Sequence, residues 1–461
     1  MRHRSLIAAL ALATAPLGAS AAETLKVPFE YHKLENGLKV VLSKDTTAPT
    51  ATVAVYYNIG FRIEPKGRTG FAHLFEHLMF QGSGNLGKME FIKLIQKNGG
   101  VMNGSTRFDF TNYFQVVPAN TVETVLWAEA DRMKGLAITQ DNLVNQQGVV
   151  KNEVKVNVLN QPYGGFPWID MPMTANTNWY NAHNFYGDLA ELDAATLQDA
   201  KAFFETYYAP NNAVVVVSGD IDPVQTLGWI RKYFGSIKSS ILPARPDISE
   251  PRQAVEKRAV KEYLEAPRPA IAVAYHTPKR LTPEYFALGL IDQILLQGKD
   301  SRLYQALVQE KGYTDDVSGG INSDLGNLFD ISGPTFFQAY LFHDKSTPPG
   351  VILDAFDAEV EKLRTAPVDA ATLELAKVKA RSWLYSQAED FFGFGRANLL
   401  ASFALFDDDP GKINSLEAEF AKVTPELIQK TAQEYLRKSN RTILTVPGKP
   451  EPPKVSKPVG F

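Results

Sequence analysis

The chain carries the same strand pattern twice, and this repeat limits the folds open to it. Residues 52–60 form a run of β-branched and aromatic residues that ends in a turn, and residues 270–278 repeat the pattern 218 positions later. A second pair of apolar runs, residues 213–219 and 441–448, is offset by 228 positions. Two offsets that agree to within ten residues indicate a tandem duplication. We therefore expect two similar halves.

Long helical patterns lie between the predicted strands of each half, for example over residues 121–135 and 283–296. Strands and helices mixed at these lengths predict a layered α/β sandwich in each half. Residues 241–258 are rich in proline and poor in apolar residues, which predicts an extended linker.

The repeat and the linker divide the chain into two predicted domains. The predicted domains are an N-terminal one over residues 23–240 and a C-terminal one over residues 259–446. The proline-rich residues 447–461 predict an extended tail on the surface. The first 22 residues are set apart from both domains by their composition.

Those first 22 residues have the pattern of a secretory signal peptide. Arg2, His3 and Arg4 precede an apolar run from Leu6 to Leu17, and small residues suited to cleavage follow. A mitochondrial presequence is the alternative, but such a segment would be amphipathic, whereas this run is apolar all round. No later segment reaches 18 continuous apolar residues. We expect an exported, periplasmic protein with no membrane anchor after cleavage.

Composition excludes several classes of active site and partner. The 461 residues include no cysteine, which removes disulfides, thiolate metal sites, iron–sulfur clusters and cysteine nucleophiles. The net charge of −3, from 48 basic and 51 acidic residues, argues against a dedicated nucleic-acid binder, because neutralising phosphates needs a strongly basic face. Any metal ion in this chain must therefore be bound by histidine and carboxylate side chains.

One short segment, residues 68–80, concentrates such side chains. In a helix, His73 and His77 lie one turn apart on the same face, with Glu76 beside them. The order H-x-x-E-H is the inverted form of the zinc-peptidase motif, in which two imidazoles bind the metal. The alternative is a pair of hydrogen-bonded core histidines among Phe71 and other aromatic residues. A glycine cluster from Gly82 predicts the end of the helix.

A catalytic zinc ion usually takes three protein ligands and leaves one position for water. The third ligand must come from elsewhere in the chain, and the composition favours a carboxylate. The residues alone do not choose among Glu123, Glu129 and Glu153.

Several blocks of the sequence resemble the inverzincins of peptidase family M16, which includes pitrilysin, insulin-degrading enzyme and mitochondrial processing peptidase. These blocks are residues 68–82, 99–113, 149–153 and 203–220, and with the repeated halves they cover nearly all of the mature chain. The resemblance is to the smaller-subunit bacterial branch. It implies an α+β fold of two homologous α/β-sandwich domains, each a mixed, largely antiparallel sheet packed by helices.

The resemblance also implies an activity and a ligand set. The chain would be a zinc metalloendopeptidase that hydrolyses short or unfolded peptides, with one Zn²⁺ per chain. His73, His77 and Glu153 would be the metal ligands, and Glu76 would be the general base that activates water. Gln146 occupies a position where the family often has a glutamate near the metal. Its amide could still form a hydrogen bond to a metal ligand, but it lacks the negative charge of glutamate.

The family resemblance extends to the substrate. Residues 100–117 resemble an edge strand that takes an extended peptide by β-augmentation. The substrate-binding residues would then be Asn103, Gly104, Ser105 and Thr106. A hairpin of purely structural value is the alternative. The peptide itself and the cleavage position stay open.

The C-terminal half departs from the family pattern. It has no second H-x-x-E-H motif. In active members this half, or a partner subunit, contributes an arginine and, seven residues later, a tyrosine that stabilise the oxyanion. Counting seven back from Tyr313 gives Ala306, and alignment on Gly312 places Gln309 and Asp315 at the pair. The Arg/Tyr pair is therefore absent from this chain.

This absence leads to a hypothesis about partners. The chain would be the zinc-bearing subunit of a heterodimer, and a homologous subunit without H-x-x-E-H would supply the Arg/Tyr pair. A homodimeric peptidase that works without the pair is one alternative. A non-catalytic scaffold or binding subunit of the same fold is the other.

Overall fold

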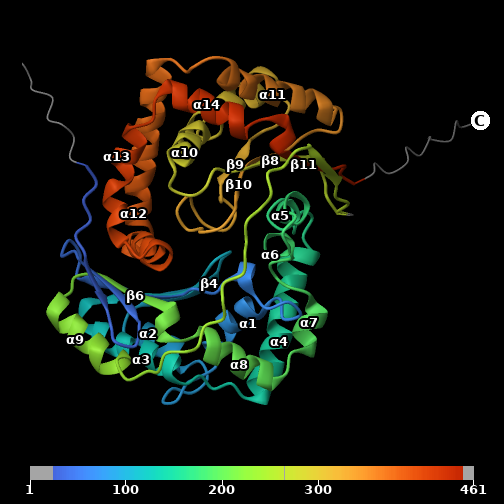
Figure 1. The fold of residues 1–461 in the computed structure, drawn as a ribbon. Coiled ribbons are helices and arrows are strands. Elements are labelled where there is room, and N and C mark those ends of the chain that lie inside the picture. The colour runs from blue at the N-terminus through green and yellow to red at the C-terminus, as the bar shows by residue number, and fades with distance from the viewer. Residues whose placement is uncertain (1–23, 264, 450–461) are drawn as a thin grey trace, which may run out of the picture.

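The structure is a computed structural model, and it describes residues 24–263 and 265–449. The predicted signal peptide and most of the predicted tail lie outside the described residues. Two β-sheets form the centres of the two halves (Figure 1). The first sheet contains β1 (Glu30–Lys33), β2 (Lys39–Lys44), β3 (Thr50–Tyr57), β4 (Val101–Thr106), β5 (Thr111–Pro118) and β6 (Ala213–Gly219). The second contains β7 (Lys257–Val260), β8 (Ala270–His276), β9 (Ser318–Ile321), β10 (Phe336–Phe342) and β11 (Arg441–Val446).

The strand orders of the two sheets confirm the duplication. The first sheet runs β1-β2-β6-β3-β5-β4, and the second runs β7-β11-β8-β10-β9. In each sheet one pair is parallel, β2 with β6 and β7 with β11, and the other pairs are antiparallel. Apart from the additional β1, the two sheets have the same topology, which is the predicted mixed, largely antiparallel type.

The N-terminal half contains more helices than the C-terminal half. Those of the N-terminal half are α1 (Phe71–Leu78), α2 (Glu90–Lys97), α3 (Val122–Lys134), α4 (Gln140–Val154), α5 (Asp170–Ala175), α6 (Trp179–Ala182), α7 (Leu189–Ala194), α8 (Leu197–Tyr207) and α9 (Pro223–Phe234). Those of the C-terminal half are α10 (Pro283–Leu295), α11 (Pro349–Thr365), α12 (Ala370–Asp407), α13 (Leu416–Ala421) and α14 (Pro425–Tyr435). In the described part of the chain, no helix combines the length and apolarity needed to cross a membrane.

One face of the first sheet is covered by the other half of the chain. Alternate strand residues point to opposite faces, so Val41, Tyr56 and Phe114 pack against α12, whereas their neighbours face the N-terminal helices. The hydroxyl of Tyr56 donates to Asn398 at 2.7 Å, and the ring of Phe114 stacks on Phe394 with centroids 3.8 Å apart. The long helix of the C-terminal half thereby completes the N-terminal core (Figure 1).

The second sheet is in turn covered on one face by a helix of the N-terminal half. Ala270, Ala272 and Ala274 form one face of β8, and their small side chains allow α5 of the N-terminal half to approach closely. Met171 and Ala175 of α5 are buried in this contact. Each sheet is therefore covered on one face by its own helices and on the other by a helix from the opposite half.

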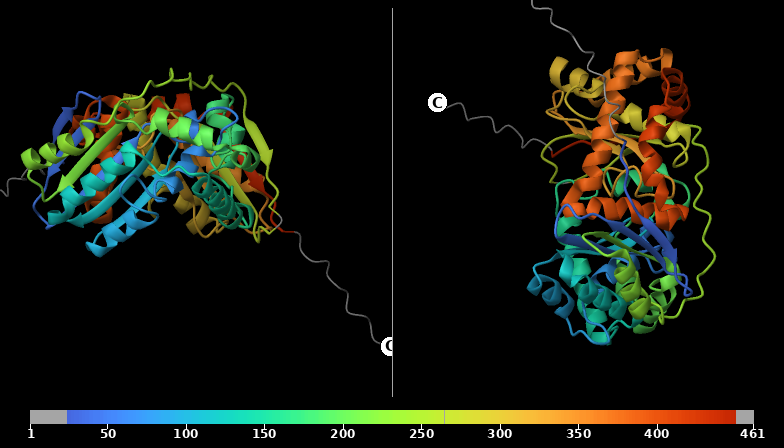
Figure 2. Two further views of the ribbon diagram at one scale, coloured as in Figure 1. Left: turned by 90° about the horizontal axis from the view of Figure 1, so that it is seen from below. Right: turned by 90° about the vertical axis from the view of Figure 1, so that its left-hand side faces the viewer.

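The connection between the halves is extended. Residues 238–256 contain no helix or strand and run along the outside of the molecule as a yellow-green line (Figures 1 and 2). Glu250 fixes this segment to the N-terminal half by accepting hydrogen bonds from the backbone N–H groups of Thr177 and Asn178. β7 begins at Lys257, two residues inside the predicted linker, because it pairs with β11 from the far end of the chain.

A buried ion pair of the N-terminal half is hydrogen-bonded to the C-terminal half next to the first sheet. Arg62 and Asp109 are 1% and 4% exposed, and Nε of Arg62 lies 2.7 Å from Oδ1 of Asp109. The other carboxylate oxygen accepts the backbone N–H groups of Ser332 (2.8 Å) and Gly333 (3.2 Å) in the C-terminal half. The guanidinium also donates to the carbonyl of Pro334 at 3.0 Å. Both charges are thus compensated within an interface between the halves.

We predict that Asp109→Ala lowers the free energy of unfolding by about 3–5 kcal/mol, because it leaves the Arg62 guanidinium buried without its counter-ion. Urea denaturation followed by circular dichroism measures the change. Asp315→Ala is the control, since Asp315 pairs with Arg268 at the surface and its loss should change the midpoint little. Equal midpoints for the two variants would show that the Arg62–Asp109 pair does not join the halves energetically.

Candidate metal centre

The helix that carries H-x-x-E-H is short, and buried groups fix its start. α1 begins after Gly70, whose φ of 86° lies in the left-handed region that favours glycine. The carboxylate of Glu64 accepts the backbone N–H groups of Gly70 (2.9 Å) and Ala72 (2.5 Å), which would otherwise lack partners at a helix N-terminus. Burial raises the pKa of Glu64 to about 8. α1 ends at Leu78, just before the predicted glycine cluster.

The two histidines of α1 meet Glu153 of α4. The Nε2 atoms of His73 and His77 lie 3.3 Å apart. Oε1 of Glu153 is 3.5 Å from His73 Nε2, and Oε2 is 3.2 Å from His77 Nε2. Hydrogen bonding to the two imidazoles holds the pKa of Glu153 well below its usual range. Within residues 24–263 and 265–449, this is the one cluster of three such side chains that could hold a metal ion.

These separations fit a zinc ion. Ligand atoms about 2.0–2.1 Å from a tetrahedral zinc lie about 3.3–3.4 Å apart, which matches the observed 3.2–3.5 Å. Two imidazole nitrogens and a carboxylate also form the donor set that zinc takes in catalytic sites. Of the three carboxylates that the sequence left open as a third ligand, the structure therefore brings Glu153 to the histidines.

Glu76 lies on the same helix and contacts the edge of the first sheet. Its Oε2 accepts a hydrogen bond from Oγ1 of Thr106 at 2.6 Å. A Cβ atom at Gly104 would lie 3.2 Å from Cγ of Glu76, so the glycine allows β4 to approach α1 closely. The carboxylate of Glu76 is thus held beside β4 and near the metal ligands of its own helix.

Of residues 100–117, for which the family resemblance implied an edge strand, β4 lies at the edge of the sheet and β5 lies inside it, between β3 and β4. Since the N–H of Arg107 donates to the carbonyl of Phe110, the odd-numbered residues of β4 pair with β5 and the even-numbered ones face outward. Gly104 and Thr106 therefore present backbone N–H and C=O groups at the open edge, next to Glu76. Asn103 accepts the Gly104 N–H at 2.9 Å, which places its amide at that edge.

The other predicted site residues lie close by with different partners. Ser105 donates to Asn112 of β5 at 2.5 Å, a contact within the sheet. Gln146 is buried on α4, and its amide donates to Asn145 at 2.7 Å, while no hydrogen bond joins it to the three ligands among the described residues. Its influence on a metal ion stays a prediction.

Two residues near the ligands have no signal in the sequence that could have identified them. Tyr186 packs its ring on His73, with centroids 5.0 Å apart, and Trp168 contacts Tyr186 edge-on at 5.4 Å. Burial, together with the charges of Glu153 and Glu76, raises the pKa of Tyr186 to about 12. Both aromatic residues come from the segment that follows α4, and only the tertiary structure brings them to α1.

The C-terminal half has a different set of side chains at the equivalent place. α10 follows β8 as α1 follows β3, and its partly buried Asp292 lies beside Gly320 of edge strand β9, as Glu76 lies beside Gly104. Burial raises the pKa of Asp292 to about 7, and the carboxyl accepts a hydrogen bond from Gln297 at 3.0 Å. α10 contains no histidine, so this half lacks a counterpart of the imidazole pair.

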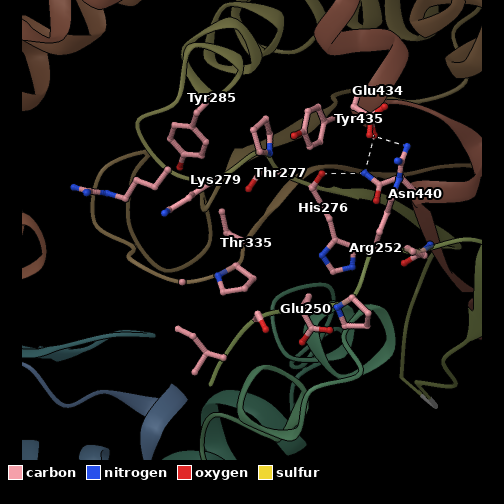
Figure 3. Close-up of a pocket in the computed structure, with 18 of the residues that line it drawn as sticks. Glu250, Arg252, His276, Thr277, Lys279, Tyr285, Thr335, Glu434, Tyr435 and Asn440 are labelled. Atoms are coloured by element: carbon pink, nitrogen blue, oxygen red, sulfur yellow. Dashed lines mark hydrogen bonds and ion pairs between the residues drawn. The ribbon is translucent and has the colours of Figure 1, made fainter. Parts of the chain in front are cut away.

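A cavity of about 570 Å³ lies away from the candidate metal centre, between the interdomain segment and the C-terminal half (Figure 3). Its lining includes Glu250 and Arg252 of the interdomain segment and His276 and Tyr435 of the C-terminal half. None of the three metal ligands, Glu76 or β4 contributes to its wall. It is therefore separate from the candidate metal centre and is formed by the interdomain segment and the C-terminal half.

Comparison with family models assigns the two halves to one family. Residues 39–164 match the model described as insulinase (peptidase family M16), and residues 194–379 match the model described as the peptidase M16 inactive domain. The metal ligands and Glu76 lie in the first match, whereas the half without the motif contains most of the second.

Individual relatives agree with this assignment. The chain is 28% identical over 456 residues to a protein named zinc protease PqqE from Helicobacter pylori, covering 96% of this chain and 99% of the relative. A crystal structure of a protease from Helicobacter pylori superposes with a TM-score of 0.83 at 26% identity, covering 92% of this chain and all of the other. The periplasmic protease PqqL from Escherichia coli matches in fold, with a TM-score of 0.74 at 17% identity over 92% of this chain and 48% of that protein.

We predict that the purified protein contains about one zinc ion per chain and that His77→Ala lowers this to a small fraction, because two ligands remain where zinc sites need three. Inductively coupled plasma mass spectrometry after dialysis gives the metal content. His183→Ala is the control, since His183 hydrogen-bonds to backbone carbonyls outside the cluster. Equal zinc content in both variants would contradict the ligand assignment.

Proposed function

The chain belongs to peptidase family M16, and from this premise we propose that it is a zinc metalloendopeptidase acting on short or unfolded peptides. The observation that carries the proposal is the convergence of His73, His77 and Glu153, with Glu76 beside them on the same helix. Relatives named zinc proteases support it. A purely structural role for the histidines would not require their Nε2 atoms to face each other at 3.3 Å.

His73, His77 and Glu153 would hold one zinc ion per chain. When bound, zinc acts as a Lewis acid that polarises the scissile carbonyl and makes water a stronger nucleophile. Glu76 accepts a proton from the attacking water and then donates it to the leaving amine. The hydrogen bond from Thr106 holds the Glu76 carboxylate in one orientation for both transfers.

β4 would bind the substrate. An extended peptide that pairs with the outward-facing groups of Gly104 and Thr106, and takes the Gly104 N–H from the side chain of Asn103, adds a strand to the sheet. Its backbone then supplies affinity without a particular sequence. This pairing would place a peptide bond next to Glu76. Most backbone groups of a folded protein are already paired in its own helices and sheets, which favours short or unfolded substrates.

We also propose that the chain is exported to the periplasm and works as the zinc-bearing subunit of a heterodimer. The apolar leader and the periplasmic relative in Escherichia coli support export. The missing Arg/Tyr pair supports a second, homologous subunit that completes the site. The complete ligand set favours this role over that of a non-catalytic scaffold.

Glu76→Gln should keep the zinc content and lower kcat by about 10²–10⁴-fold, because the amide cannot accept the proton of water. The assay is cleavage of an unstructured fluorogenic peptide, together with metal analysis of the same sample. Glu90→Gln on α2 is a control that removes an exposed carboxylate outside the site. An active Glu76→Gln protein with full zinc content would exclude Glu76 as the general base.

Mixing the chain with a homologous subunit that lacks H-x-x-E-H and carries the Arg/Tyr pair should raise kcat/KM at least tenfold, since oxyanion stabilisation contributes about 10²–10³-fold. Peptidase assays across a titration, with gel filtration of the mixture, test this expectation. Full activity of the isolated chain with no gain on mixing would favour the homodimeric alternative.

A further inference from the structure

The two ring nitrogens of His73 have very different surroundings. Nε2 faces His77 and Glu153 in the candidate metal centre. Nδ1, on the other side of the ring, is buried and has no hydrogen-bond partner among the described residues. Histidines that bind metals almost always donate this second N–H to a carboxylate, a carbonyl or water, which fixes the ring orientation. No protein group among the described residues provides that restraint for His73, which is only 5% exposed.

Aromatic packing restrains the ring of His73 instead. Tyr186 lies against it at 5.0 Å between centroids, with the ring planes inclined by 59°. The ring of His77 lies at 4.8 Å and is nearly perpendicular, at 85°. Tyr186 and His77 thus limit rotation of the His73 imidazole.

Tyr186 is itself held in place. Trp168 contacts its ring edge-on at 82°, and the indole N–H of Trp168 donates to the carbonyl of Gly164 at 2.8 Å. The chain then passes so close to α1 that a Cβ atom at Gly187 would lie 2.4 Å from the backbone nitrogen of Gly70. The position of Tyr186 is therefore coupled to the start of the helix that carries both histidine ligands.

We propose that Tyr186 is a positioning residue for the metal centre, whose ring orients His73, since no protein group among the described residues is hydrogen-bonded to its Nδ1. This inference rests on the proposed zinc site. The ring, not the hydroxyl, has this role, because the hydroxyl makes no hydrogen bond within the described part of the chain. Loss of the ring lets the imidazole rotate, and zinc affinity falls as it does when other groups that orient a ligand are removed, by about 10–100-fold.

The test measures zinc affinity of the purified full-length chain by competition with a chromogenic chelator. Tyr186→Leu should raise the Kd for zinc about 10–100-fold, whereas Tyr186→Phe, which keeps the ring, should stay within about threefold of the wild type. Tyr207→Leu is the matched control, because Tyr207 is also half-buried and packs on Phe203 away from the ligands. Its Kd should not change.

The outcomes separate this inference from the proposed function. A wild-type chain that binds no zinc removes the metal site itself. A wild-type chain that binds zinc, with equal Kd values for Tyr186→Leu, Tyr186→Phe and wild type, overturns the role of Tyr186 alone. Weak binding by both Tyr186 variants would assign the effect to the hydroxyl and also overturn the proposal.

A second measurement guards against a folding defect in Tyr186→Leu. In the cobalt-substituted protein, the visible absorption bands report the geometry of the ligands without any turnover. Trp168→Leu removes the support of Tyr186 and leaves Tyr186 in place, so it should shift these bands in the same direction as Tyr186→Leu but less. Unchanged bands in a folded Trp168→Leu protein would contradict the proposed restraint.

Discussion

The exchange of helices between the two halves is the constraint on which the rest of the structure depends. Each sheet has one face that its own half does not cover, and α12 and α5 cover these faces from the opposite halves. If the halves were separated, each sheet would expose one large apolar face to water. The buried Arg62–Asp109 pair, whose two members both belong to the N-terminal half, lies in the same interface and is hydrogen-bonded there to the backbone of the C-terminal half.

The hairpin between β4 and β5 connects this interface to the candidate metal centre. Asp109 lies in that hairpin and binds the C-terminal backbone, and Thr106, three residues before it, donates to Glu76. The same region of the sheet thus holds the halves together and orients the proposed general base. Glu64 performs a similar role at the start of α1, since it joins the loop after β3 to the first turn of the helix.

The duplication explains what the second half retains. Asp292 of α10 lies beside Gly320 of an edge strand, as Glu76 of α1 lies beside Gly104. The C-terminal half therefore keeps the helix next to the edge strand, but α10 has no histidines that could bind a metal ion. In the proposed enzyme, the C-terminal half contributes α12, which covers the first sheet, and the backbone groups that bind Asp109. The proposed partner subunit would contribute the Arg/Tyr pair that this half lacks.

The sequence by itself determined the repeat, the helix with His73, Glu76 and His77, and the exclusion of cysteine ligands, because these features depend on local spacing and composition. The resemblance to a family implied that Glu153 is the third metal ligand and that residues 100–117 contain an edge strand. Only the tertiary structure decided which carboxylate meets the histidines, that Tyr186 packs on His73, and that α12 completes the first sheet. These contacts join segments from 76 to more than 300 residues apart, and such long-range packing leaves no periodic pattern in the local sequence.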